Sequence, residues 1–163
     1  GQLLITKSDI ENEQRRTNLE NTFEKLFEYG AVPVINENDS VATEEIVYGD
    51  NDSLSAIVAR LIHAEALIIL SDIDGLFDDN PNENPDARLI PVVKEITDEI
   101  KALCGEAGTS RGTGGMVTKI HAAEIATEAG IPTVIMNGEA PQDIYKLIDG
   151  HSTGTIFLCK EAE

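Results

Sequence analysis

Residues 66–72 of this chain read ALIILSD, a run that is apolar at every position from Ala66 to Leu70. A short run that is apolar throughout is typical of a strand covered on both faces, as in a parallel sheet flanked by helices. Ser71 and Asp72 follow it directly and mark the end of the strand. We therefore predict a strand over 66–71 that is covered on both faces, with polar side chains at its carboxyl end.

On either side of this strand, short apolar runs alternate with longer amphipathic segments. Such alternation predicts an α/β fold, a three-layer αβα sandwich with a mainly parallel sheet. No repeat or linker divides the chain, so 1–163 is expected to be one domain. The predicted strands are 2–6, 31–36, 66–71, 89–93, 132–136 and 155–159, and the predicted helices are 11–29, 53–63, 98–104, 116–129 and 141–148.

The composition of the chain argues against several classes of function. The chain has 163 residues, with 41% hydrophobic and 26% charged, and 12 Lys+Arg against 30 Asp+Glu give a net charge of −18. So acidic a chain is repelled by phosphate backbones, which argues against a general nucleic-acid binder. Two distant cysteines are too few for a disulfide framework or a zinc site and favour a reducing cytoplasm. No apolar run approaches the roughly 20 residues that a membrane helix needs.

Polar residues follow three of the predicted strands. They are the run Asn-Glu-Asn-Asp at 36–39, the pair Ser71-Asp72 and the pair Asn137-Gly138. Ligands of parallel sheets bind beyond the carboxyl ends of the strands, so we expect these loops to open at one edge.

A second polar run, Gly-Asp-Asn-Asp at 49–52, precedes the helix predicted from residue 53. Asp50 or Asp52 is a candidate helix cap. Asn51 with two carboxylates also suits a zwitterionic amino acid, and a carboxylate here can orient a lysine.

A glycine-rich segment over 105–115 leads into a helix that carries Lys119. Phosphate oxygens are bound well by exposed backbone amides, a helix N-terminus and an ammonium group, and this segment combines all three. A flexible connector has the same composition, so that interpretation stays open. The spacing is not that of a Walker A loop. The acidic loop 72–86 lacks the spacing of an EF-hand and is interpreted as a solvated loop.

Four of these segments resemble the glutamate 5-kinases of the amino acid kinase family: VPVINEND at 32–39, EIVYGDNDSLSA at 45–56, LSDIDGL at 70–76 with Asn80-Pro81, and GTGGMVTK at 112–119. The resemblance runs from Gly1 to about Phe157. It implies ATP-dependent phosphorylation of the side-chain carboxylate of L-glutamate, the first step of proline biosynthesis. It also implies a cytoplasmic enzyme and a homo-oligomer, with a glutamyl phosphate reductase as a possible downstream partner.

The resemblance also implies roles for individual residues. Asp39 and Asn51 match positions that hold glutamate, and Asp52 matches an aspartate that orients catalytic lysines. Lys119 would contact the transferring phosphoryl group. Mg²⁺ would be held largely by ATP oxygens and water, without a protein metal site. The ATP-binding positions would be Ser71, Asp72, Thr113, Gly114, Gly115, Met116, Val117, Thr118 and Lys119.

Two motifs of the family are absent from this sequence. They are a first strand that ends in Lys-x-Gly-Ser/Thr and a Ser-Gly-Ala segment that binds substrate. The chain therefore resembles the later part of a kinase domain, and we expect it alone to bind ATP weakly and to have little activity. Two alternatives remain: a relative with a different acceptor, against which the Asn-Glu-Asn-Asp run argues, and a nucleotide-binding module without transfer activity.

Overall fold

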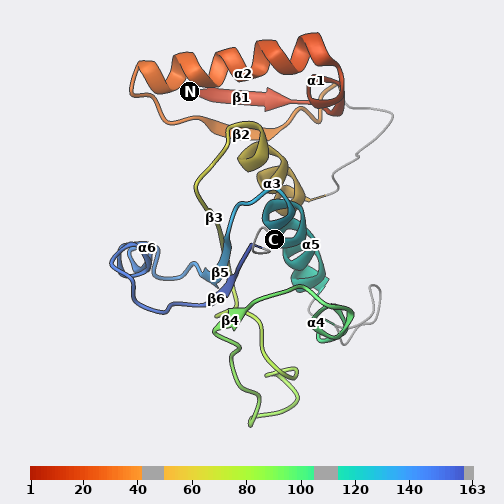
Figure 1. The fold of residues 1–163 in the computed structure, drawn as a ribbon, viewed down its shortest axis with the longest axis vertical. Coiled ribbons are helices and arrows are strands. Elements are labelled where there is room, and N and C mark those ends of the chain that lie inside the picture. The colour runs from red at the N-terminus through yellow and green to blue at the C-terminus, as the bar shows by residue number, and fades with distance from the viewer. Residues whose placement is uncertain (42–49, 105–113, 160–163) are drawn as a thin grey trace.

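The structure is a computed structural model that describes residues 1–41, 50–104 and 114–159. Helices and strands alternate along most of the chain, as predicted (Figure 1). In order, the elements are β1 (Gln2–Ile5), α1 (Lys7–Glu11), α2 (Glu13–Glu28), β2 (Val34–Glu37), α3 (Asn51–Leu61), β3 (Leu67–Ser71), β4 (Val92–Val93), α4 (Asp98–Ala102), α5 (Gly114–Glu128), β5 (Thr133–Asn137), α6 (Asp143–Ile148) and β6 (Thr155–Phe157).

The first predicted helix, 11–29, corresponds to α2, and a short helix that was not predicted, α1, precedes it. Asn12 has an extended backbone (φ −79°, ψ 120°) and separates α1 from α2. Its side-chain Oδ1 accepts a hydrogen bond of 3.0 Å from the backbone N–H of Arg15 and so caps α2. Asparagine is among the strongest N-cap residues, which explains why the chain starts a new helix here.

The strands form two sheets within the described residues. β1 and β2 pair in parallel, and a four-stranded sheet has the order β3-β5-β6-β4. β3 pairs with β5 in parallel and β4 with β6 in parallel, whereas β5 and β6 are antiparallel. The prediction of a mainly parallel α/β fold is confirmed, but the described strands lie in two sheets rather than one.

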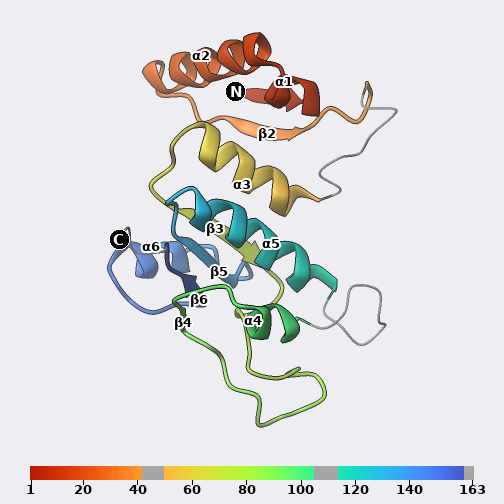
Figure 2. The ribbon, with the colours of Figure 1, turned by 45° about the vertical axis from the view of Figure 1, so that its right-hand side comes forward.

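α3 connects the two parts of the core. Leu54, Ile57 and Val58 pack with Phe23 of α2 and Ile5 of β1 in one apolar cluster. On another face of α3, Ala56 and Ala59 belong to the cluster of the larger sheet, together with three alanines of α5 at 122, 123 and 126. Small side chains let α3 and α5 lie close together, and Figure 2 shows the two helices side by side. This packing fixes the beginning of α3 against the beginning of α5.

β3 is only partly covered. Leu67 and Ile69 are buried, but Leu70 is 43% exposed. The expectation that both faces of this strand are covered is therefore wrong at its carboxyl end. β3 is an edge strand of its sheet, and Leu70 lies at the rim where the loop at 72 begins.

Candidate functional site

The beginning of α3 carries two aspartates with different roles. Asp50 is the N-cap, and its Oδ1 accepts from the backbone N–H of Ser53 at 2.6 Å. The Ser53 hydroxyl donates to Oδ2 of Asp50 at 3.2 Å. The prediction that one of the two aspartates caps this helix is confirmed. Because Asp50 accepts from the Ser53 amide and caps the helix, Asp52 is free to face a different element.

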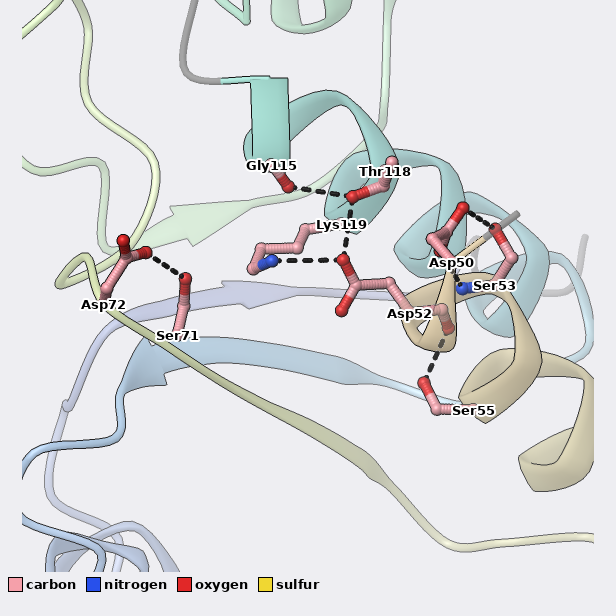
Figure 3. Close-up of polar contacts among 9 residues, drawn as sticks. All are labelled: Asp50, Asp52, Ser53, Ser55, Ser71, Asp72, Gly115, Thr118 and Lys119. Atoms are coloured by element: carbon pink, nitrogen blue, oxygen red, sulfur yellow. Dashed lines mark hydrogen bonds and ion pairs between the residues drawn. The ribbon is translucent and has the colours of Figure 1, made fainter. Parts of the chain in front are cut away.

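Asp52 faces α5. Lys119, in the second turn of that helix, donates from Nζ to Oδ2 of Asp52 at 3.0 Å (Figure 3). The side chains of Lys119 and Asp52 are only 14% and 21% exposed. Solvent therefore screens this ion pair less than an ordinary surface pair. Thr118 donates to the same oxygen at 2.7 Å. The α3–α5 contact, meaning Asp52 with Thr118 and Lys119, is the centre of the candidate site.

The N-terminal ends of two helices meet at this contact, the first turn of α3 and the first two turns of α5. A helix N-terminus carries partial positive charge on its free N–H groups, and this favours anions. Gly115 precedes Lys119 by one turn, and a Cβ at this position would lie 3.6 Å from Nζ, so the ammonium lies over backbone without a side chain. In a chain of net charge −18, this ammonium next to two helix N-termini is suited to a phosphate oxygen.

The residues predicted to form the ATP loop differ in their environments. Gly114 begins α5, Gly115 is exposed and Val117 is half-buried. Met116 is 3% exposed and belongs to the core, so a nucleotide contact at this position would use its backbone. Thr113 lies outside the described residues. These are the positions for which an ATP contact was predicted, and that role stays a prediction.

Ser71 and Asp72 lie where β3 ends, as predicted. The Ser71 hydroxyl donates to Oδ1 of Asp72 at 3.1 Å, and Figure 3 draws the pair to one side of Lys119, with Asp52 to the other. Ser71 is the register partner of Asn137 in β5. Two of the three predicted polar loops therefore open at one edge of the same sheet. The third loop follows β2 and belongs to the other sheet.

The predicted substrate residues belong to the segment after β2 and to the beginning of α3. Asp39 is exposed in the turn after β2, and Asn51 is the exposed first residue of α3. Asn51 lines a cavity of about 440 Å³ between β2, α3 and β3, with Ile35 on its β2 side. Within 1–41, 50–104 and 114–159, no hydrogen bond joins Asp39 to Asn51. Their shared role in substrate binding stays a prediction.

Two features of the site were not found from the sequence. The Asn137 amide donates to Oδ1 of Asp74 at 2.8 Å and ties the loop after β3 to the end of β5. Oε1 of Glu37, at the end of β2, is buried and has no hydrogen-bond partner among the described residues. The position of Glu37 between two asparagines is the only signal in the sequence, and it does not show which oxygen is buried.

The described residues include no group of three or more His, Cys, Asp or Glu side chains placed to hold a metal ion. The helices of the described segments are also too short or too polar to cross a membrane.

Comparison with known proteins identifies the family of the chain. The profile of the amino acid kinase family matches residues 1–137. A glutamate 5-kinase of Clostridium acetobutylicum is 52% identical over 160 residues, covering 98% of this chain and 60% of that protein. A glutamate 5-kinase of Haemophilus influenzae is 50% identical over 163 residues, covering 100% of this chain and 44% of that protein. The chain thus spans about half the length of the curated relatives it matches.

Solved structures of kinases share the fold. An isopentenyl phosphate kinase superposes with a TM-score of 0.59 at 25% identity, over 83% of this chain and 49% of that one. The UMP kinase of Ureaplasma parvum has a TM-score of 0.60 at 19% identity, over 85% of this chain and 52% of that one, and supports the fold alone. From the family profile, which covers most of the sequence, we conclude that the chain belongs to the amino acid kinase family.

Proposed function

We propose that this chain supplies the nucleotide-binding part, and part of the substrate site, of an ATP-dependent glutamate 5-kinase. The observation that carries the proposal is the ion pair between Lys119 and Asp52 where α3 and α5 begin. The relatives that are about 50% identical over nearly the whole chain support glutamate as the acceptor.

The proposed reaction is a phosphoryl transfer. An oxygen of the glutamate side-chain carboxylate forms a bond to the γ-phosphorus of ATP, and the bond from that phosphorus to the bridging oxygen breaks. The products are the acyl phosphate and ADP. Such a transfer needs positioning and neutralisation of charge more than covalent chemistry by the protein. Mg²⁺ bound to the phosphates would supply part of that neutralisation.

Lys119 is the residue of this chain that we assign to the transferring phosphoryl group. Its ammonium is held by Asp52 rather than free in solvent, so its position is set before ATP binds. A preorganised charge stabilises a transition state without reorganising during the reaction. Asp52 would act on the reaction through Lys119.

The remaining assignments complete the proposal. Ser71, Asp72 and the segment 113–117 would contact the nucleotide, while Asp39 and Asn51 would bind glutamate. A cytoplasmic location fits ATP as a substrate and the two free cysteines, Cys104 and Cys159. A homo-oligomer and a downstream reductase that consumes the unstable acyl phosphate belong to the same proposal.

The first experiment measures acceptor-dependent ADP formation by the complete protein that contains this chain. Hydroxylamine traps an acyl phosphate as a hydroxamate, which identifies a carboxylate acceptor. We expect ADP and hydroxamate with L-glutamate, no hydroxamate above background with aspartate or N-acetylglutamate, and no ADP above background with UMP. ATP binding without turnover on any of these acceptors would favour a nucleotide-binding module. Turnover on an acceptor other than glutamate would contradict the assignment of glutamate as the substrate.

Substitution of the lysine tests the assigned role. Lys119→Met should lower kcat by about 100-fold to 1,000-fold, the usual effect of removing one preorganised group that stabilises transition-state charge. Lys146→Met is the control, because Lys146 pairs with Asp143 on the exposed surface of α6. Equal kcat values for the two variants would contradict the role of Lys119.

The glutamate site is tested separately. Asp39→Asn and Asn51→Ala should raise KM for glutamate more than KM for ATP, because both residues are assigned to the acceptor. Equal effects on the two KM values, or none, would move the acceptor site away from the ends of β2 and α3.

A further inference from the structure

Thr118 makes two contacts with one hydroxyl group. Its Oγ1 lies 2.7 Å from Oδ2 of Asp52 and 2.9 Å from the backbone carbonyl oxygen of Gly115. The first contact joins residues 66 positions apart in the sequence and links α5 to α3, whereas the second stays within α5. Figure 3 shows Thr118 and Lys119 reaching the same carboxylate from consecutive positions.

The chemistry of the groups determines the direction of the hydrogen bond. A threonine hydroxyl has one proton to donate, and an ionised carboxylate only accepts. The proton of Thr118 therefore points to Asp52, in a bond strengthened by the negative charge. The approach to Gly115 is the usual contact of a helical threonine with the carbonyl three residues earlier, and it restricts the side-chain rotamer. Thr118 is thus a donor oriented in advance.

Both donors end on a single oxygen. Nζ of Lys119 lies 3.0 Å from Oδ2 of Asp52, the oxygen that Thr118 also contacts. With one donor, the carboxylate would be free to turn about its last side-chain bond, and the lysine ammonium would follow it. With two donors from neighbouring residues of one helix, the carboxylate has one orientation relative to α5.

We propose that Thr118 is a positioning residue whose hydroxyl orients Asp52 and, through Asp52, the ammonium of Lys119. This proposal rests on the proposed function, since it gives Lys119 a role in phosphoryl transfer. It differs from the role that the sequence implied for Thr118, in which the residue contacts ATP directly.

α5 contains a matched control. Thr127 Oγ1 lies 2.8 Å from the carbonyl oxygen of Ala123, so it makes the same kind of contact within the helix. Its second acceptor is another backbone carbonyl, that of Glu124 at 3.3 Å, rather than a carboxylate of α3. Replacing Thr127 by Val removes the helix contact without touching Asp52. Valine has the branched shape of threonine, so neither substitution changes helix propensity much.

The kinetic test compares Thr118→Val, Thr118→Ser and Thr127→Val in the complete protein. We expect Thr118→Val to lower kcat about tenfold, the usual effect of losing a hydrogen bond to a charged group, with KM for ATP unchanged. Thr118→Ser keeps the donor and should restore most of kcat, and Thr127→Val should resemble the wild type. A rise in KM for ATP with kcat unchanged would overturn the proposal in favour of a nucleotide contact. Equal kcat values for Thr118→Val and Thr127→Val would also overturn the proposal.

A second measurement does not depend on activity. A double-mutant cycle with Thr118→Val and Asp52→Asn compares the urea midpoints of the two single variants and the double variant. We expect the double variant to lose less than the sum of the single losses, because both changes break one contact. Additive losses in a protein that phosphorylates glutamate would overturn the proposal alone. If the losses are coupled but the protein does not phosphorylate glutamate, the contact between Thr118 and Asp52 is supported and the proposed function is overturned.

Discussion

Thr155 in β6 and Thr118 in α5 each bond a distant segment through one hydroxyl, over 79 and 66 positions of sequence. Their surroundings are opposite. Thr155 is 0% exposed, and its partners are backbone groups: it accepts from the N–H of Leu76 at 2.8 Å and donates to the carbonyl of Ile90 at 2.7 Å. Thr118 is half-buried, and its distant partner is the charged side chain of Asp52.

This difference separates a structural contact from a functional one. The hydroxyl of Thr155 satisfies two backbone groups from which water is excluded. These two hydrogen bonds therefore stabilise the attachment of the loop between β3 and β4 to the sheet. The α3–α5 contact remains reachable by a ligand. We therefore expect substitutions around Thr155 to change the free energy of unfolding, and substitutions in the α3–α5 contact to change turnover.

The largest expected effect is at Gly154, directly before Thr155. Its φ is +74°, and a Cβ would overlap the carbonyl oxygen of Ile135 and lie 2.8 Å from Cβ of Met136. Gly154→Ala combines left-handed strain with a backbone clash and should lower the free energy of unfolding by about 3–5 kcal/mol. Thermal or urea unfolding measures it.

Gly150→Ala is the control for this substitution. Gly150 has a φ of +83°, but no atom of the described part of the chain lies within 4 Å of a Cβ at this position. Gly150→Ala should therefore lower the free energy of unfolding only by the backbone strain, about 1–2 kcal/mol. Equal losses at the two positions would mean that the region around Thr155 is looser than its contacts indicate.

The next effect is that of Thr155→Val. This substitution keeps the shape but leaves the buried N–H of Leu76 without an acceptor, which costs about 1–3 kcal/mol. Thr155→Ser keeps the hydroxyl and should lose less. If Thr155→Val left the urea midpoint unchanged while lowering kcat, the distinction between the two threonines would be wrong.

Much of the fold follows from local sequence signals. The apolar run at 66–70 and the alternation of segments predicted the elements and their mainly parallel pairing. α1 was missed, because Lys7–Glu11 contains one apolar residue, Ile10, and so shows no helical spacing. The capping preference of Asn12 was the available signal for a separate helix after it.

The site was predictable in its residue types but not in its pairings. Asp50 and Asp52 were equivalent as caps in the sequence, because the direction of each side chain depends on how α3 lies against α5. The partner of Thr118 was not predictable either, because the sequence of α5 does not indicate which carboxylate, 66 positions away, its hydroxyl contacts. Thr155 was read only as part of a strand. Contacts of this kind depend on tertiary packing, which neither periodicity nor motif spacing determines.

A smaller effect is expected at the cap of α3, which lies next to the α3–α5 contact but serves structure. Asp50→Ala removes the acceptor for the Ser53 amide and should lower the free energy of unfolding by about 1 kcal/mol. Asp50→Asn retains an acceptor and should lose only a fraction of this. Comparable losses in both variants would indicate that the charge of Asp50, and not its capping bond, stabilises the helix.

The smallest effect concerns the side of α5 that faces away from Asp52. Cys104 lies in the core and lines a cavity with Val117 and Ile120 of that helix. Burial disfavours the thiolate and raises the pKa of Cys104 from 9.0 to about 11. The folded protein therefore holds this proton more tightly than the unfolded chain. The stabilising contribution is complete below the unfolded pKa and is lost as the pH rises from 9 toward 11.

Labelling with a thiol reagent measures this pKa on the folded protein. In a Cys159→Ser variant, Cys104 should react very slowly at pH 8, because the thiolate is the reactive form, and faster as the pH rises toward 11. In a Cys104→Ser variant, the partly exposed Cys159 should react readily at pH 8. Fast labelling of Cys104 at pH 8 would mean that the packing behind α5 opens. Because Thr118 and Lys119 belong to the same helix, their fixed position opposite Asp52 would then need a source other than the core.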